Sequence, residues 1–310
     1  MRTLTKLFLG SVLLLNGAVT MAHSDGAYED SNFFEEMNNG DKAAIMMVHF
    51  GTTFDDTRAL TIDRINEKVQ KKFKNVPVKE AYTSRIIMRR LKERGIVKDN
   101  PAEALDKLAK EGYTHIIVQP TNVINGVESK TLEQQLEMYK DKFKEIRTGS
   151  ALLSTPEDYK AVAEIIDKEV GKVTDNEAVV LVGHGTHDNG NAAYPAMDYT
   201  AKSMGYKFYV GTIEGFPEFD DVVRGLKKDN IKKVILMPFM FVAGDHANND
   251  IAVDWKEALE KEGFIVEVKL TSLGMMEDIR KMFIDHAKFM LENKKEDMIS
   301  KKLFYSTQKD

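Results

Sequence analysis

Short apolar runs alternate with amphipathic stretches along most of the chain. Seven apolar runs have the length of strands, at residues 44–50, 78–83, 115–120, 178–184, 207–213, 232–240 and 264–270. Between them, apolar residues recur at helical spacing, as in 56–73, 85–94, 132–146, 156–170 and 216–228. Buried strands that alternate with helices are typical of α/β proteins with parallel sheets. The pattern therefore predicts an α/β fold.

The two halves of this pattern resemble each other. VHFGTTFDD at 48–56 matches VGHGTHDNG at 182–190, because both run from a strand into a Gly-Thr turn. QPTNVINGVE at 119–128 matches MPFMFVAGDH at 237–246 through equally spaced Pro and Gly residues. The repeat predicts two similar doubly wound (flavodoxin/Rossmann-like) parallel-sheet domains related by pseudo-twofold duplication. Such sheets bind ligands at the carboxyl ends of their strands, so we expect a cleft between the domains.

The amino-terminal end has the composition of a secretory signal. Arg2 and Lys6 precede an apolar run at 7–19, and small residues precede a cleavage position after Ala22. The run is shorter than the roughly 20 residues that a membrane-spanning helix needs. We predict export to the periplasm, cleavage, and no stable membrane insertion afterwards. An uncleaved amino-terminal anchor is the alternative.

These patterns divide the chain into five segments. We expect a signal peptide at 1–22, a mobile polar leader at 23–41, an amino-terminal α/β domain at 42–150, a carboxyl-terminal α/β domain with the metal ligands at 151–294, and a polar tail at 295–310. The boundary near 150 lies in TGSALLSTP, whose Gly, Ser and Pro residues are typical of a connection between domains.

Charge and cysteine content exclude several classes of function. The chain has 44 basic and 49 acidic residues and a formal charge of −5, which argues against nucleic acid as a partner. It has no cysteine, which excludes thiolate nucleophiles, iron–sulfur clusters and disulfides. Any metal ion must therefore be held by nitrogen and oxygen ligands.

Three residues that can bind metal or protons stand at the ends of predicted strands. His184, Glu214 and His246 each end such a strand or follow it closely. Because the carboxyl ends of parallel strands share one edge, we expect the three side chains to face the same cleft. Imidazole and carboxylate ligands suit divalent cobalt, iron, nickel or zinc. The alternative is three unrelated polar loop residues.

Three strings in the second half resemble one enzyme family. LVGHGTHDNGNAAYPAMD, VGTIEGFPEFDDVV and LMPFMFVAGDHANNDIA resemble the anaerobic sirohydrochlorin cobaltochelatases, which are class II tetrapyrrole chelatases. The resemblance extends over residues 42–290. It implies a lyase that inserts Co²⁺ into sirohydrochlorin and releases two pyrrole protons, as in cobalamin biosynthesis. It also implies that His184, Glu214 and His246 are the metal ligands and catalytic residues.

The resemblance also extends to the first half of the chain. The acidic residue that follows an Asn-Gly pair in the family corresponds to Glu128. This chain has His49 where the family commonly has serine, and Asn122 where it often has histidine. One histidine at the rim of the cleft is thus replaced and another is gained, and we expect Glu128, His49 and Asn122 to contact the substrate.

Basic side chains are needed at the same rim, because sirohydrochlorin carries many carboxylates. Arg85, Arg89 and Arg90 lie in the segment SRIIMRR, near the start of a predicted helix. Arg85 is the candidate for substrate binding. A solvated helix face is the alternative explanation for all three arginines.

Two other functions would use the same residues and stay open on the sequence alone. A periplasmic carrier of haem or metal can also be an exported protein with two α/β lobes and a cleft. Insertion of iron into a tetrapyrrole, or its removal, would need the same ligands, so iron or haem stands beside cobalt. The predicted partners are a tetrapyrrole and a divalent metal ion, and the formation of a homo-oligomer stays open.

Overall fold

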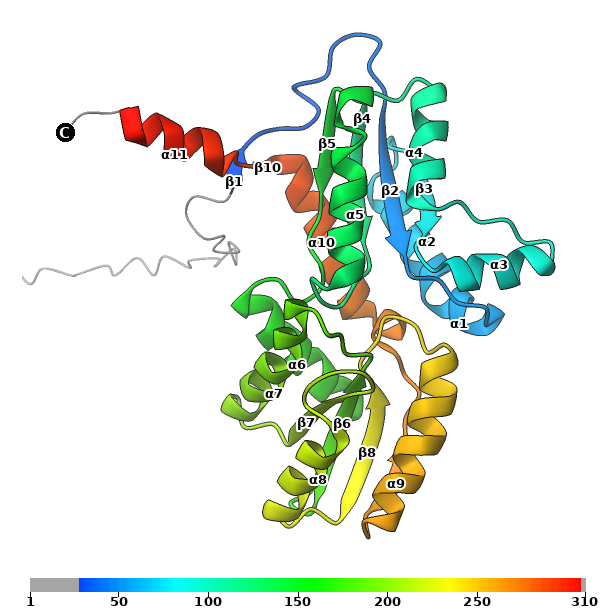
Figure 1. The fold of residues 1–310 in the computed structure, drawn as a ribbon, viewed down its shortest axis with the longest axis vertical. Coiled ribbons are helices and arrows are strands. Elements are labelled where there is room, and N and C mark those ends of the chain that lie inside the picture. Colours follow the sequence, from blue (N-terminus) through cyan, green and yellow to red (C-terminus); the bar gives the residue numbers. More distant parts are fainter. Residues whose placement is uncertain (1–27, 308–310) are drawn as a thin grey trace, which may run out of the picture.

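The computed structural model describes residues 28–307, which form two four-stranded parallel sheets and the helices around them (Figure 1). The first sheet has the order β3-β2-β4-β5, with strands Val78–Tyr82, Ala43–His49, His115–Pro120 and Glu145–Thr148. The second has the order β7-β6-β8-β9, with strands Phe208–Thr212, Glu177–Gly183, Lys233–Pro238 and Ile265–Val268. The predicted α/β fold with two similar parallel sheets is confirmed.

The strand register agrees with the internal repeat of the sequence. Val48 lies opposite Pro120 in the first sheet, and Val182 lies opposite Pro238 in the second. The two matched pairs of strings place these residues at equivalent positions. The arrowheads of β2 and β8 point toward the middle of the molecule (Figure 1). The carboxyl ends of the two sheets therefore face each other.

Helices connect the strands in both halves. The first half contains α1 (Asp55–Leu60), α2 (Ile62–Lys72), α3 (Arg85–Glu93), α4 (Pro101–Lys110) and α5 (Val127–Glu137). The second half contains α6 (Pro156–Val170), α7 (Ala193–Ser203), α8 (Phe219–Lys228), the π-helix η3 (Ala247–Trp255) and α9 (Lys256–Lys261). Short 3₁₀ turns are η1 (Lys140–Lys142), η2 (Asn189–Ala192) and η4 (Leu273–Met275).

The helix predicted over 132–146 is wrong in its second part. The helix α5 ends at Glu137, and β5 begins at Glu145. Tyr139 and Phe143 are nevertheless buried. They continue the spacing of the buried leucines of α5, so the apolar pattern looks helical beyond the true end of the helix.

Part of the segment predicted as a mobile leader, the described residues 28–41, forms regular structure and packs against the rest of the chain. Tyr28–Asp30 form β1, which pairs antiparallel with β10 (Asn293–Lys295). Phe33 is fully buried, and the guanidinium of Arg147 lies over its ring at 5.1 Å. Long-range packing therefore orders this polar segment. The predicted signal peptide at 1–22 lies outside the described residues.

The last long helix, α10 (Glu277–Glu292), packs against the first half (Figure 1). Arg147 of β5 donates hydrogen bonds to the carbonyl oxygens of Met290 and Asn293, each at 3.1 Å. The segment 151–294, predicted as one domain, thus contributes its last helix to the other one. The predicted polar tail contains the exposed helix α11 (Met298–Thr307). Within residues 28–307, no helix has both the length and the apolar character needed to span a membrane.

Candidate metal site

His184 and His246 lie side by side in the structure. His184 directly follows β6, and His246 stands at the start of η3, after the loop that follows β8. The centroids of the two imidazole rings are 4.6 Å apart, and the ring planes meet at 88°. The fold therefore brings together two histidines from two strand ends at the edge that faces the first half.

Hydrogen bonds leave the same atom of each ring free. Nδ1 of His184 lies 3.1 Å from the carbonyl oxygen of Gly185, and Nδ1 of His246 lies 2.5 Å from Oδ2 of Asp250. Both oxygens only accept, so Nδ1 is the donor in each ring. Neither Nε2 has a hydrogen-bond partner within residues 28–307. Each Nε2 can therefore present its lone pair to a metal ion.

Glu214 lies next to His184 through its backbone. Its N–H donates to the carbonyl oxygen of His184 at 2.8 Å. Gly185 has a φ of +84°, and a Cβ there would lie 2.7 Å from the carbonyl carbon of Glu214, so the close approach requires glycine. The carboxylate is exposed and has no hydrogen bond or ion pair to other described residues.

The carboxylate of Glu214 does not complete a metal site in this arrangement. Among the described residues, no group of three His, Cys, Asp or Glu side chains is arranged to hold a metal ion. The structure thus brings together the two predicted histidine ligands and leaves the predicted carboxylate ligand apart.

The candidate substrate-binding residues of the first half lie on separate elements. Asn122 is half-buried in the loop after β4, Glu128 is half-buried in the first turn of α5, and Arg85 is the exposed first residue of α3. These three side chains have no hydrogen bond or ion pair within the part of the chain that the structure describes. Lys130 lies 2.7 Å from both carboxylate oxygens of Asp188, so the start of α5 lies against the loop after β6.

His49 is buried, with 1% of its surface exposed. Its Nδ1 lies 3.0 Å from Oγ1 of Thr121, and its Nε2 lies 3.0 Å from Oδ1 of Asn66. Burial lowers the pKa of His49 to about 4, against the opposing charge of Glu80. In this structure both ring nitrogens of His49, which the sequence predicts to contact the substrate, are engaged within the protein.

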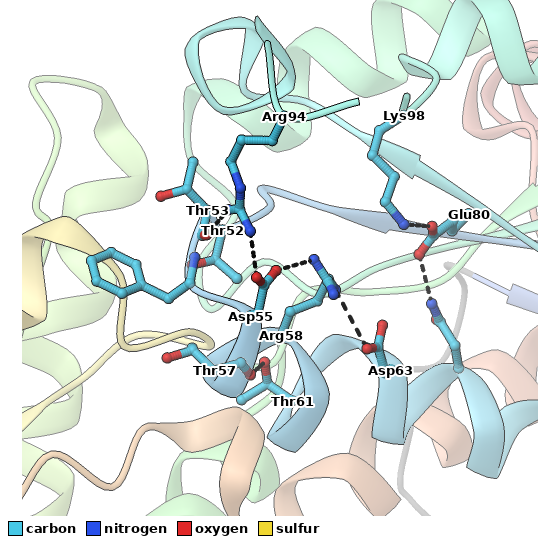
Figure 2. Close-up of polar contacts among 12 residues, drawn as sticks. Thr52, Thr53, Asp55, Thr57, Arg58, Thr61, Asp63, Glu80, Arg94 and Lys98 are labelled. Atoms are coloured by element: carbon cyan, nitrogen blue, oxygen red, sulfur yellow. Dashed lines mark hydrogen bonds and ion pairs between the residues drawn. The ribbon is translucent and has the colours of Figure 1, made fainter. Parts of the chain in front are cut away.

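A polar network holds the loop between β2 and α1 (Figure 2). Arg94 donates to the carbonyl oxygen of Thr53 at 2.6 Å and also pairs with Asp55. Arg58 pairs with Asp55 at 2.8 Å and with Asp63 at 3.4 Å. The network ties this loop and the start of α2 to the carboxyl-terminal end of α3.

The same region positions the loop that leads to His246. Thr57 of α1 donates from Oγ1 to the carbonyl oxygen of Ala243 at 3.1 Å, and this contact is buried. Phe241 stacks on the ring of His49 at a centroid distance of 6.2 Å. The first half of the chain therefore supports the loop that carries one histidine of the pair.

Asp250, the hydrogen-bond partner of His246, is not among the residues predicted from the sequence. Asp250 follows His246 by four residues, a spacing that places two side chains on one face of a helix. The spacing of His and the last Asp in DHANND could therefore have predicted this hydrogen bond. The π-helix that carries Asp250 is of a type that often marks functional sites.

Solved chelatase structures have the same fold. SirB from Bacillus subtilis with Fe³⁺ aligns with a TM-score of 0.61 at 16% identity, over 81% of this chain and 96% of that chain. The sirohydrochlorin chelatase SirB from Bacillus subtilis subspecies spizizenii in complex with cobalt gives 0.58 at 14% identity, with the same coverage of both chains. At these identities the likeness establishes the two-sheet chelatase fold.

Sequence comparison identifies the family. The family model described as cobalt chelatase (CbiK) matches residues 43–292. The sirohydrochlorin cobaltochelatase of Salmonella typhimurium is 33% identical over 250 residues, which cover 79% of this chain and 95% of that protein. The sirohydrochlorin cobaltochelatase CbiKC of Nitratidesulfovibrio vulgaris is 31% identical over 253 residues, with 79% and 89% covered.

This chain belongs to the cobalt chelatase family. The resemblance noted in the sequence is confirmed, and with it the prediction of a metal chelatase whose metal substrate is cobalt.

Proposed function

We propose that this protein is a sirohydrochlorin cobaltochelatase, which inserts Co²⁺ into the tetrapyrrole and releases two pyrrole protons. The observation that carries the proposal is the pair of adjacent imidazoles, His184 and His246, whose Nε2 atoms have no hydrogen-bond partner among the described residues. The chain's membership of the cobalt chelatase family and the names of its relatives support this substrate pair.

In this proposal, His184 and His246 act both as ligands and as bases. Two imidazoles hold the ion while leaving coordination positions for departing water and incoming pyrrole nitrogens. As the metal passes to the ring, each released Nε2 accepts one pyrrole proton. Asp250 keeps the ring of His246 oriented through Nδ1. Glu214 has no protein partner among the described residues, so its carboxylate is available to turn toward the ion as a third, anionic ligand.

Residues of the first half contact the macrocycle in this scheme. Glu128, Asn122 and Arg85 face solvent at least in part, and the polar atoms of their side chains lack partners within residues 28–307. We assign substrate contact to these three side chains. His49 has a different role, because its stacking on Phe241 supports the loop before His246.

Single substitutions at the histidine pair test the proposal. His184→Ala and His246→Ala should each lower the initial rate of Co²⁺ insertion by about 100-fold or more, because ligand and base are lost together. Formation of the cobalt tetrapyrrole is followed by visible absorption, and circular dichroism checks the fold. His187→Ala, in an exposed position of the same loop, is the matched control and should keep the wild-type rate. Near wild-type turnover in either alanine variant of the pair would contradict the assignment.

Glu214→Gln and the unmodified protein complete the test. The glutamine variant should fold normally and bind Co²⁺ more weakly, since it lacks the anionic ligand. A haem or metal carrier on this fold would bind metal-free sirohydrochlorin without forming the cobalt product. Binding without turnover would therefore favour a carrier over the enzyme, and Fe²⁺ in place of Co²⁺ tests the iron alternative.

We also propose that the protein is exported to the periplasm and self-associates. Export is supported by the basic and apolar pattern of residues 1–22. Self-association is supported by α11, which exposes the apolar side chains of Ile299, Leu303 and Phe304. Mass spectrometry of a periplasmic extract should find a chain that starts at or near His23 and, under native conditions, a multiple of its mass. An intact Met1 in the cytosol would contradict export, and a purely monomeric mass would contradict self-association.

A further inference from the structure

A cation of the first half lies beside the residue that precedes His246. Arg90 of α3 places Nη1 2.7 Å from Oδ2 of Asp245. About half of each side chain is exposed, 51% for Arg90 and 49% for Asp245. Because Asp245 directly precedes His246 in the chain, the guanidinium lies at the rim of the candidate metal site.

The loop that carries Asp245 is held in place by other contacts. The carbonyl oxygen of Ala243 accepts from Oγ1 of Thr57 at 3.1 Å and from Nδ2 of Asn248 at 3.3 Å. Asn248 also donates to the carbonyl oxygen of Gly244 at 2.8 Å. Since exposed ion pairs contribute little to stability, the pair of Arg90 and Asp245 is not needed to fix this loop.

Exposed apolar side chains lie on α3 and beside its first residues. Ile86 precedes Arg90 by four residues, so the two share one face of α3, and 57% of Ile86 is exposed. Phe50 directly follows β2, and 45% of its side chain is exposed. Its carbonyl oxygen accepts a hydrogen bond from the backbone N–H of Ser84, the N-cap residue of α3. Apolar surface beside a guanidinium suits a flat macrocycle whose edge carries carboxylates.

We propose that Arg90 binds a peripheral carboxylate of the tetrapyrrole, and that Asp245 pairs with this guanidinium while the site is empty. The substrate carboxylate replaces Asp245 on binding, which releases Asp245 beside His246. This role rests on the proposed function of the site and adds a recognition residue to it. Exchange of one carboxylate for another conserves the ion pair, so the polyanionic substrate is selected over neutral macrocycles.

Two substitutions with opposite expected effects test the exchange. Arg90→Gln should raise KM for sirohydrochlorin about tenfold, the effect of losing one charge-assisted hydrogen bond, with kcat little changed. Arg90→Lys should recover part of this loss, since it restores the charge without the planar fork. Asp245→Asn should lower KM about two- to fivefold, because the competing carboxylate is gone. Lys92→Gln, which removes a positive charge from another face of α3, is the matched control and should leave KM unchanged.

Equilibrium binding of metal-free sirohydrochlorin, followed by absorption, provides a readout that does not depend on turnover. If the pair of Arg90 and Asp245 only stabilised the loop, Arg90→Gln and Asp245→Asn would change KM in the same direction. That result would overturn the proposed exchange of carboxylates. An unchanged KM in Arg90→Gln would also overturn it, while wild-type insertion of Co²⁺ would still uphold the proposed function. If the wild-type protein neither binds sirohydrochlorin nor inserts Co²⁺, the proposed function fails together with this inference.

Discussion

At the scale of single residues, position relative to a strand end decided which candidate side chains could be predicted. His184 and His246 were recognisable as candidates because each stands near the carboxyl end of an apolar strand, where sheets of this type bind ligands. His49 also ends an apolar strand, β2, yet it is buried. Its partners, Thr121 and Asn66, come from other elements, so nothing in the local sequence distinguishes a rim histidine from a core one.

The buried state of His49 gives the native protein a measurable pH dependence. Its native pKa of about 4 lies below the value near 6.5 expected in the unfolded chain, so the unfolded state binds more protons between these values. Stability should therefore fall as the pH decreases from about 6.5 toward 4. The loss from this group should be about 2 kcal/mol between pH 7 and pH 5.

Denaturant titrations at pH 7 and pH 5 would measure this contribution. The side-chain amide of His49→Gln can still donate and accept hydrogen bonds but does not titrate. Its pH-dependent loss of unfolding free energy should therefore be smaller than that of the wild-type protein by about this amount. An equal loss of unfolding free energy in both proteins would show that His49 does not titrate in this range.

At the scale of elements, apolar pattern predicted the strands well and failed where the buried residues are charged. The strand β4 at His115–Pro120 coincides with the predicted run, as does the helix α6 at Pro156–Val170. The strand β5 was missed because its buried side chain is Arg147. That guanidinium is satisfied by the carbonyl oxygens of Ser31, Met290 and Asn293, far away in sequence. Buried polar groups with remote partners leave no periodic signal in the sequence.

At the scale of the whole molecule, α10 joins the two halves through a buried pair. His286 of α10 places Nε2 3.2 Å from Oδ1 of Asp158, at the start of α6, and Nδ1 3.3 Å from the carbonyl oxygen of Ser150. Burial raises the pKa of Asp158, but the hydrogen bond and charge of His286, with the N–H groups around Thr155, outweigh it and leave that pKa below its ordinary value. The connection between the halves, predicted near 150 from its Gly, Ser and Pro residues, is therefore held by hydrogen bonds to α10.

Removing the contact between His286 and Asp158 should lower the stability of the whole molecule. His286→Ala leaves the buried carboxylate of Asp158 without its cationic partner, which should lower the free energy of unfolding by about 3–5 kcal/mol. Lys281→Ala, which removes an exposed ion pair with Asp285 on the same helix, is the matched control and should change it by less than about 1 kcal/mol. Trp255 is the single tryptophan and lies in the second half, so its fluorescence reports that half, while far-ultraviolet circular dichroism reports both.

The unfolding transitions followed by fluorescence and by circular dichroism should coincide in the wild-type protein and separate in His286→Ala, because the variant loses a contact that couples the halves.

The depressed pKa of Asp158 sets the sign of the pH effect on the stability lost in His286→Ala. Its contribution is fully present above the unfolded value of about 3.9 and is lost as the pH falls through the lower native value. His286→Ala should therefore approach the wild-type stability in strong acid and differ most from it above pH 4. A variant with wild-type stability at neutral pH would show that the pair of His286 and Asp158 does not hold the two halves together.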